Sequence, residues 1–96
     1  METRKDILDK LAVGKEALAG PYKVKRLALF GSWARGDNHP DSDVDVLVEV
    51  DPSIGLDFVV LAERLEELLG LPVDLVSHRA VKPKLMESIR PELIYV

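Results

Sequence analysis

Apolar residues recur at helical spacing near the start of the chain. Ile7, Leu11 and Leu18 fall on one face of a period of 3.6 residues, which predicts an amphipathic helix. Thr3 stands just before this segment, where its hydroxyl can cap the first turn. Residues 20–21, a Gly-Pro pair, mark the end of the helix because proline cannot continue it.

A strict alternation of side chains follows in the middle of the sequence. One face of the segment carries Val44, Val46, Val48 and Val50, and the other carries Asp43, Asp45, Leu47 and Glu49. Side chains alternate between the two faces of a strand, so this segment predicts a strand with one apolar face. We expect the valine face to pack under helices and the aspartate face to stay open. An earlier apolar stretch, Val24 to Phe30, predicts another strand.

The second half of the chain predicts two helices and two short strands. A helix is expected from Leu56 to Leu69, where Gly70 and a following proline stop it. Val73 to Val76 reads as a short strand that carries Asp74. A helix from Pro83 to Ile89 and an edge strand from Leu93 to Val96 complete the predicted elements.

The lengths of the connections predict the fold class. The chain between Pro52 and Leu69 is long enough for a helical crossover, so the second and third strands can be parallel. The first strand must end near the start of the second to bring Ser32 to the aspartates, so that pair should be antiparallel. We therefore predict an α/β (α+β) fold: a small mixed β-sheet with helices on one face.

Length and composition narrow the function classes. The 96 residues fit a single domain spanning residues 1–96, and the formal net charge is −4 with no cysteine. Generic nucleic-acid binding needs a basic face, and the net negative charge argues against one. We therefore do not expect such binding. No apolar run approaches the ~20 residues of a membrane span, so no membrane partner is expected. The absence of cysteine fits a reducing compartment, and we predict a cytoplasmic protein.

Three aspartates in strands and one glycine-serine turn carry the candidate chemistry. Asp43 and Asp45 lie two residues apart among valines, and Asp74 starts the neighbouring strand. Gly31 and Ser32, at the end of the first strand, can present backbone N–H groups and a hydroxyl to phosphate. Clustered carboxylates suit Mg²⁺ or Mn²⁺, and two ions beside a triphosphate suit phosphoryl-type transfer. The pattern predicts metal-dependent chemistry on a nucleoside triphosphate.

These motifs resemble the nucleotidyltransferase superfamily typified by DNA polymerase beta, and most of all its smallest members, the minimal nucleotidyltransferases. The family pattern is a hydrophobic strand, Gly-Ser, about ten residues and Asp-x-Asp. It stands here as residues 27–36, LALFGSWARG, followed by residues 42–48, SDVDVLV. The third family carboxylate falls on Asp74. The resemblance covers nearly the whole chain and implies the polymerase beta-like nucleotidyltransferase fold.

The resemblance also implies roles for single residues. Gly31 and Ser32 would hold triphosphate oxygens, Asp43 and Asp45 would bind both metal ions, and Asp74 would complete the site near the attacking hydroxyl. Two roles are open for Arg35: it reaches phosphate, or it ties down the acidic loop. A triphosphate contact is one interpretation for His78 and its neighbour Arg79, while His39 is expected to be a solvated loop residue.

A protein partner is implied by the resemblance, because many minimal family members are encoded beside a small helical HEPN protein, a toxic ribonuclease. They act as its antitoxin, and some transfer AMP from ATP to a tyrosine of that partner. Independently, Phe58 to Ala62 is apolar at five consecutive helical positions. These positions encircle a helix, so some must point away from the core.

Three functions therefore stay open. The first is a protein adenylyltransferase that acts as an antitoxin. The second is an antitoxin that masks its partner by binding alone, and the third is a transferase acting on a small molecule. The nucleotide preference, the acceptor and any self-association are also open at this point.

Overall fold

The computed structural model describes residues 2–96, and its first helix starts where the sequence predicts. Helix α1 spans Arg4–Leu18 and is capped by Thr3, whose hydroxyl accepts a hydrogen bond from the Asp6 N–H. The Asp6 carboxylate accepts one in return from the Thr3 N–H at 3.0 Å, which completes the capping box. Buried Ile7 and Leu11 lie on the inner face of the helix, as their spacing predicts.

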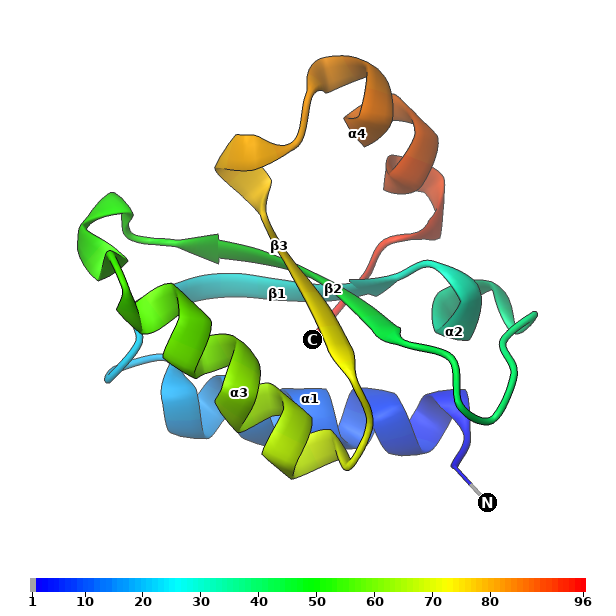
Figure 1. Cartoon of the computed structure of the whole chain (residues 1–96). Coiled ribbons are helices and arrows are strands. Elements are labelled where there is room, and N and C mark those ends of the chain that lie inside the picture. The colour runs from blue at the N-terminus through cyan, green and yellow to red at the C-terminus, as the bar shows by residue number, and fades with distance from the viewer. Residues whose placement is uncertain (1) are drawn as a thin grey trace.

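A mixed sheet of four strands forms the centre of the molecule (Figure 1). The strands are β1 (Val24–Phe30), β2 (Val44–Val50), β3 (Val73–Ser77) and β4 (Ile94–Tyr95), in the spatial order β3-β2-β1-β4. Strand β1 runs antiparallel to β2 and to β4, whereas β2 and β3 are parallel. The predicted strands and their directions are therefore confirmed.

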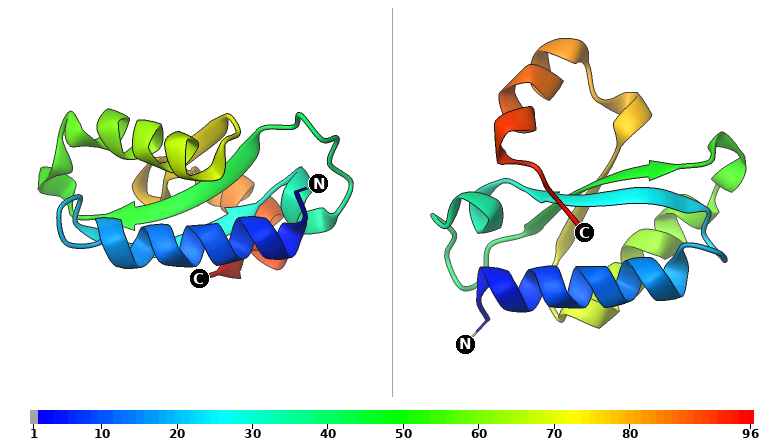
Figure 2. Two further views of the ribbon diagram at one scale, coloured as in Figure 1. Left: turned by 90° about the horizontal axis from the view of Figure 1, so that it is seen from below. Right: turned by 180° about the vertical axis from the view of Figure 1, so that it is seen from behind.

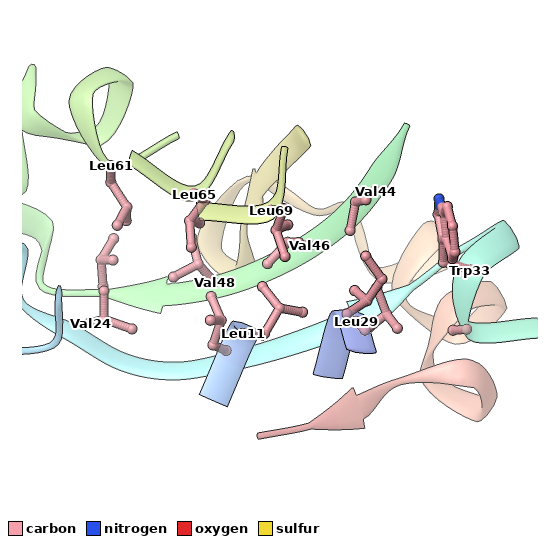
Figure 3. Close-up of a cluster of buried hydrophobic side chains, with 14 residues drawn as sticks. Leu11, Val24, Leu29, Trp33, Val44, Val46, Val48, Leu61, Leu65 and Leu69 are labelled. Carbon is pink, nitrogen blue, oxygen red and sulfur yellow. The ribbon is translucent and has the colours of Figure 1, made fainter. Parts of the chain in front are cut away.

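The valine face of β2 forms the main core. Helix α1 and helix α3 (Asp57–Leu69) lie side by side under this face (Figures 1 and 2). The crossover between the two parallel strands is α3, which buries Leu61, Leu65 and Leu69. Figure 3 shows these leucines packed against the strands. The β2 residues in this cluster are Val44, Val46, Val48 and Val50.

The prediction of helices on one face holds for α1 and α3 but is wrong for the last helix. Helix α4 (Pro83–Ile89) packs on the opposite face, where Met86 and Ile89 cover Ala28 and Leu47. Leu47 is the apolar residue on the aspartate face of β2, so that face also needs a partial cover. The sheet thus separates a large core from a small one.

Short helical turns join these elements. They are α2 (Ser32–Arg35) and three 3₁₀ turns, η1 (Pro52–Ile54), η2 (His78–Ala80) and η3 (Arg90–Glu92). The 3₁₀ turns were not predicted, because three residues are too few to show a periodicity. No helix within residues 2–96 combines the length and apolar character needed to cross a membrane.

Candidate active site

The strand register brings the predicted aspartates to one edge of the sheet. Asp45 of β2 lies opposite Asp74 in the parallel pair and opposite Phe30 in the antiparallel pair. The turn that follows Phe30 therefore reaches the same place. Asp43 lies just before β2 and is exposed, as is Asp74, whereas Asp45 is half-buried. The strand register thus brings Asp45, Asp74 and the glycine-serine turn to the same edge of the sheet, and Asp43 lies two residues before Asp45.

Gly31 makes the close approach that shapes this edge. Its backbone has φ +77° and ψ −156°, a combination that glycine alone adopts readily. A methyl group on its Cα would overlap the Asp45 carboxylate. The absence of a side chain at Gly31 therefore lets the turn lie directly against Asp45.

The short helix α2 begins at Ser32, directly after the turn. Its next residue, Trp33, is buried in the main core, and its Nε1–H donates a hydrogen bond of 3.0 Å to the Ser42 carbonyl oxygen. This bond fastens the loop that leads to Asp43. Within the described residues 2–96 the Ser32 hydroxyl makes no hydrogen bond, and its residue is only partly buried. It is therefore free to meet a ligand at the turn.

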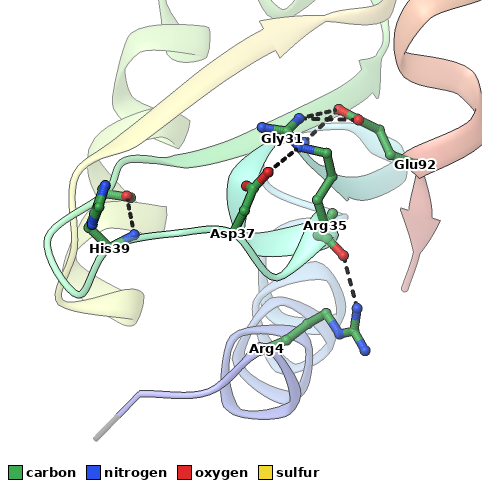
Figure 4. A network of polar contacts seen from close by, with 8 residues as sticks. Arg4, Gly31, Arg35, Asp37, His39 and Glu92 are labelled. Atoms are coloured by element: carbon green, nitrogen blue, oxygen red, sulfur yellow. Dashed lines mark hydrogen bonds and ion pairs between the residues drawn. The ribbon is translucent and has the colours of Figure 1, made fainter.

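Arg35 is held by two carboxylates (Figure 4). Its Nε donates to Asp37 Oδ2 at 3.1 Å, and its Nη1 donates to the two carboxylate oxygens of Glu92 at 3.2 and 3.3 Å. Glu92 Oε1 also accepts a hydrogen bond of 2.9 Å from the Gly31 N–H. Glu92 was not predicted from the sequence, because it lies far along the chain from Gly31 and outside any recognised motif.

The three-aspartate cluster perturbs its most buried member. Burial raises the pKa of the Asp45 carboxyl above its ordinary value of 3.8, and the charges of Asp74 and Asp43 raise it further. The nearby Arg35 guanidinium opposes this shift. Hydrogen bonds to Asp37 and Glu92 raise the pKa of Arg35 itself, so it stays protonated. One guanidinium thus faces several carboxylates, so the site has too little positive charge to balance them.

This shortage fits a divalent cation. Asp43, Asp45 and Asp74 supply only carboxylate oxygens, the ligands that Mg²⁺ prefers. Within residues 2–96, no group of three or more acidic, histidine or cysteine side chains lies close enough together to hold a metal ion. Two of the three aspartates are exposed and all repel one another, so a cage is not expected to close before a cation binds.

His78 and Arg79 lie at the other end of the sheet from the aspartates. They form η2 directly after β3, which starts next to Asp74 and ends at Ser77, opposite Val48. Strand geometry places Ser77 about 10 Å from Asp74 along the strand. The structure does not bring these two residues to the site, and His39 is exposed in the loop, as expected.

Most of the chain matches a known protein family. Residues 12–96 match the family described as "Nucleotidyltransferase domain". The chain belongs to the nucleotidyltransferase family. This assignment confirms the resemblance drawn from the Gly-Ser and Asp-x-Asp motifs, and the sheet described above is the fold expected of a minimal nucleotidyltransferase.

Two relatives of this nucleotidyltransferase match over nearly their full length. The protein adenylyltransferase MntA of Thermococcus cleftensis is 40% identical over 98 residues, covering 100% of this chain and 98% of the relative. A protein of Methanocaldococcus jannaschii, provisionally named a protein adenylyltransferase, is 43% identical over 101 residues, and both chains are covered completely.

Solved structures share the fold. A protein provisionally described as a minimal nucleotidyltransferase has a TM-score of 0.74 and 40% identity, covering 91% of this chain and 93% of the other. A toxin-antitoxin structure with AMP-PNP also has a TM-score of 0.74, at 26% identity, covering 91% of this chain and 69% of that one.

We predict that Gly31→Ala damages both stability and ligand binding, whereas Gly36→Ala damages only stability. Both glycines have positive φ, but a methyl group at Gly36 meets nothing within 4 Å. Gly36→Ala should cost about 1–2 kcal/mol of backbone strain. Gly31→Ala should cost about 1–3 kcal/mol more, because the methyl group overlaps Asp45. Urea denaturation and calorimetric titration with Mg²⁺ and nucleotide would measure both effects, and equal losses would contradict the contact.

We also predict that Asp45→Asn stabilises the metal-free protein at neutral pH. The folded-state pKa of Asp45 is raised, so its ionised form, which predominates above that pKa, weakens the fold. The advantage of the variant should shrink as the pH falls through the raised pKa towards 3.8, where the wild-type carboxyl is protonated too. The free energy of unfolding, measured by denaturation in EDTA at several pH values, tests this. The control is Asp41→Asn, which changes an exposed loop residue. A variant less stable than wild type at pH 7 would refute it.

Proposed function

We propose that this nucleotidyltransferase moves AMP from ATP to a hydroxyl of a partner protein, depends on Mg²⁺ and acts as an antitoxin. The observation that carries the proposal is the place of Asp45 in the sheet, beside Asp74 of β3 and against the Gly31 turn that follows β1. Carboxylates for cations thereby adjoin a turn suited to phosphate, which is the arrangement that nucleotidyl transfer needs.

The three aspartates divide two tasks in this proposal. Asp43 and Asp45 would hold both cations, and Asp74 would complete the site on the side of the attacking hydroxyl. When bound, Mg²⁺ or Mn²⁺ neutralises the triphosphate and the charge that develops during transfer. The hydroxyl oxygen bonds to the α-phosphorus of ATP and pyrophosphate leaves, while the hydroxyl proton passes to a carboxylate or to water.

The turn binds the triphosphate in this proposal. Ser32 offers its free hydroxyl, and the first backbone N–H groups of α2 have no acceptor within the helix. The Gly31 N–H is already bonded to Glu92, so Gly31 contributes by close approach more than by its own donor. Two roles were open for Arg35: a phosphate contact, or fixing the acidic loop in place. Its ion pairs with Asp37 and Glu92 favour the second role.

The names of the relatives support a protein partner. One relative is named a protein adenylyltransferase, and one structural neighbour is a toxin-antitoxin structure with AMP-PNP. We infer that the partner is a small helical HEPN-type toxin and that its acceptor is a tyrosine hydroxyl. ATP as the donor rests on the same likeness.

The apolar run predicted as a docking surface is only partly exposed. Leu61 is buried and Phe58 packs against the core, but Val59 is 58% exposed. Leu56, just before α3, is 88% exposed. We define Leu56 and Val59 as the α3 patch and propose that it contacts the partner. This patch would also serve an antitoxin that masks its partner without chemistry, so that alternative needs its own test.

Transfer should leave a mass increase on the partner. Incubation of this chain with the HEPN-type protein, ATP and Mg²⁺ should add one or more AMP groups, read by intact-mass spectrometry. Asp43→Asn with Asp45→Asn should abolish the increase because both cations lose their ligands. Asp41→Asn, which changes an exposed acid of the preceding loop, should leave it intact. Mapping the modified fragment of the partner then tests whether the acceptor residue is a tyrosine.

The outcomes of this experiment separate the three functions. A complex without added AMP would favour the masking antitoxin and refute the transfer. Neither complex nor added mass would favour a small-molecule acceptor. Added mass in the absence of Mg²⁺ and Mn²⁺, with EDTA present, would refute the metal dependence.

Docking should depend on the α3 patch and not on the aspartates. Val59→Asp should weaken binding of the partner at least about tenfold, because it places an unpaired charge in the contact. Val13→Asp is the matched control, since Val13 is 60% exposed but lies on α1. Affinity measured by biolayer interferometry decides the matter. Equal effects of the two variants would show that docking does not depend specifically on the α3 patch.

A further inference from the structure

Glu92 joins the end of the chain to the glycine-serine turn (Figure 4). It is the last residue of η3, just ahead of β4, and its side chain is 20% exposed. One carboxylate oxygen accepts from the Gly31 N–H, and both accept from Arg35. No other side chain in the described residues accepts a hydrogen bond from the Gly31 N–H.

The sheet itself puts Glu92 in this place. Strand β4 pairs with β1 so that Ile94 lies opposite Leu29. Glu92 lies two residues before Ile94, at the end of η3, and Gly31 lies two residues after Leu29. The pairing of β4 with β1 therefore brings η3 close to the turn, within reach of the Glu92 side chain.

A fourth carboxylate beside three aspartates requires a reason. Its charge adds to the repulsion on Asp45, so Glu92 is unfavourable there unless its own contacts compensate. Those contacts are a buried backbone donor and a guanidinium, both of which a carboxylate satisfies well. Because Gly31 lies directly against Asp45, any force that fixes Gly31 also fixes the turn relative to the proposed metal ligands.

We propose that Glu92 is a positioning residue that holds the glycine-serine turn against Asp45, acting through its hydrogen bond with the Gly31 N–H, and that Arg35 acts through Glu92. This inference rests on the proposed nucleotidyl transfer and names a further residue for it. Glu92 touches neither nucleotide nor cation. Its removal loosens the turn, so the Ser32 hydroxyl and the aspartates no longer hold one fixed spacing.

Substitutions can separate the reach of Glu92 from its charge. Glu92→Gln keeps an acceptor at the same reach, whereas Glu92→Asp keeps the charge but is one methylene too short. Calorimetry with Mg²⁺ and a non-hydrolysable ATP analogue should show binding about tenfold weaker for Glu92→Ala and Glu92→Asp, the size expected from losing one such bond. Glu92→Gln should stay within about threefold of wild type.

The control is Glu87→Ala, which removes an exposed acid of the same C-terminal segment and should bind like wild type. Partial unfolding would lower the binding stoichiometry and the melting temperature, not the affinity of the folded fraction. If Glu92→Ala does not fold, the comparison of Glu92→Asp with Glu92→Gln decides alone.

Several results would overturn the inference. Wild-type affinity in Glu92→Ala or Glu92→Asp would remove any positioning role, and tighter binding would show that Glu92 competes with phosphate. A tenfold loss in Glu92→Gln would assign the effect to the charge of Glu92 instead of the Gly31 bond, because Gln keeps an acceptor at the same reach. If wild type itself binds no nucleotide with Mg²⁺, the proposed function fails instead.

Arg35 is tested by the double variant. If Arg35 acts only through Glu92, adding Arg35→Ala to Glu92→Ala should weaken nucleotide binding by no more than about twofold relative to Glu92→Ala alone, because the two side chains act as one unit. A further tenfold loss would mean that Arg35 contacts the triphosphate directly, and the part of the inference concerning Arg35 would be wrong.

Discussion

The parallel pairing of β2 with β3 is the interaction on which the rest of the structure depends. It sets Asp45 beside Asp74, although the two residues are separated by the whole of α3 in the sequence. Parallel strands need a crossover, and α3 supplies it by burying its leucines against the valines of β2. The same strand pairing thus forms both the core and the edge of the sheet that carries the aspartates. Burial of the apolar face offsets the repulsion between the carboxylates on the opposite face.

Most of this arrangement could be predicted because the relevant signals are local. The alternation from Val44 to Val50 fixes which side chains face the core, and the crossover length fixes the direction of β3. Gly-Ser and Asp-x-Asp stand in one short stretch, so they are readable as a motif. The family assignment then agrees with what the motif implies.

The parts that escaped prediction depend on contacts between distant segments. Nothing local to Met86 and Ile89 shows that they cover Leu47, so α4 was expected with the other helices. Glu92 was missed for the same reason, since only the register of β4 with β1 brings it to Gly31. The outward direction of Val59 also required the position of α3 on the sheet, because five consecutive apolar residues have no single preferred face.

The contact between Gly31 and Glu92 also has a consequence for the order of folding. It closes a loop of 61 residues and relies on β4, a strand of two residues at the edge of the sheet. Long closures form late, and short edge strands open readily in local fluctuations. The hairpin of β1 and β2 can therefore assemble with the turn still mobile, and the turn becomes rigid only when the last strand docks. Competence to bind a nucleotide would then arrive as a separate, final event after the core has formed.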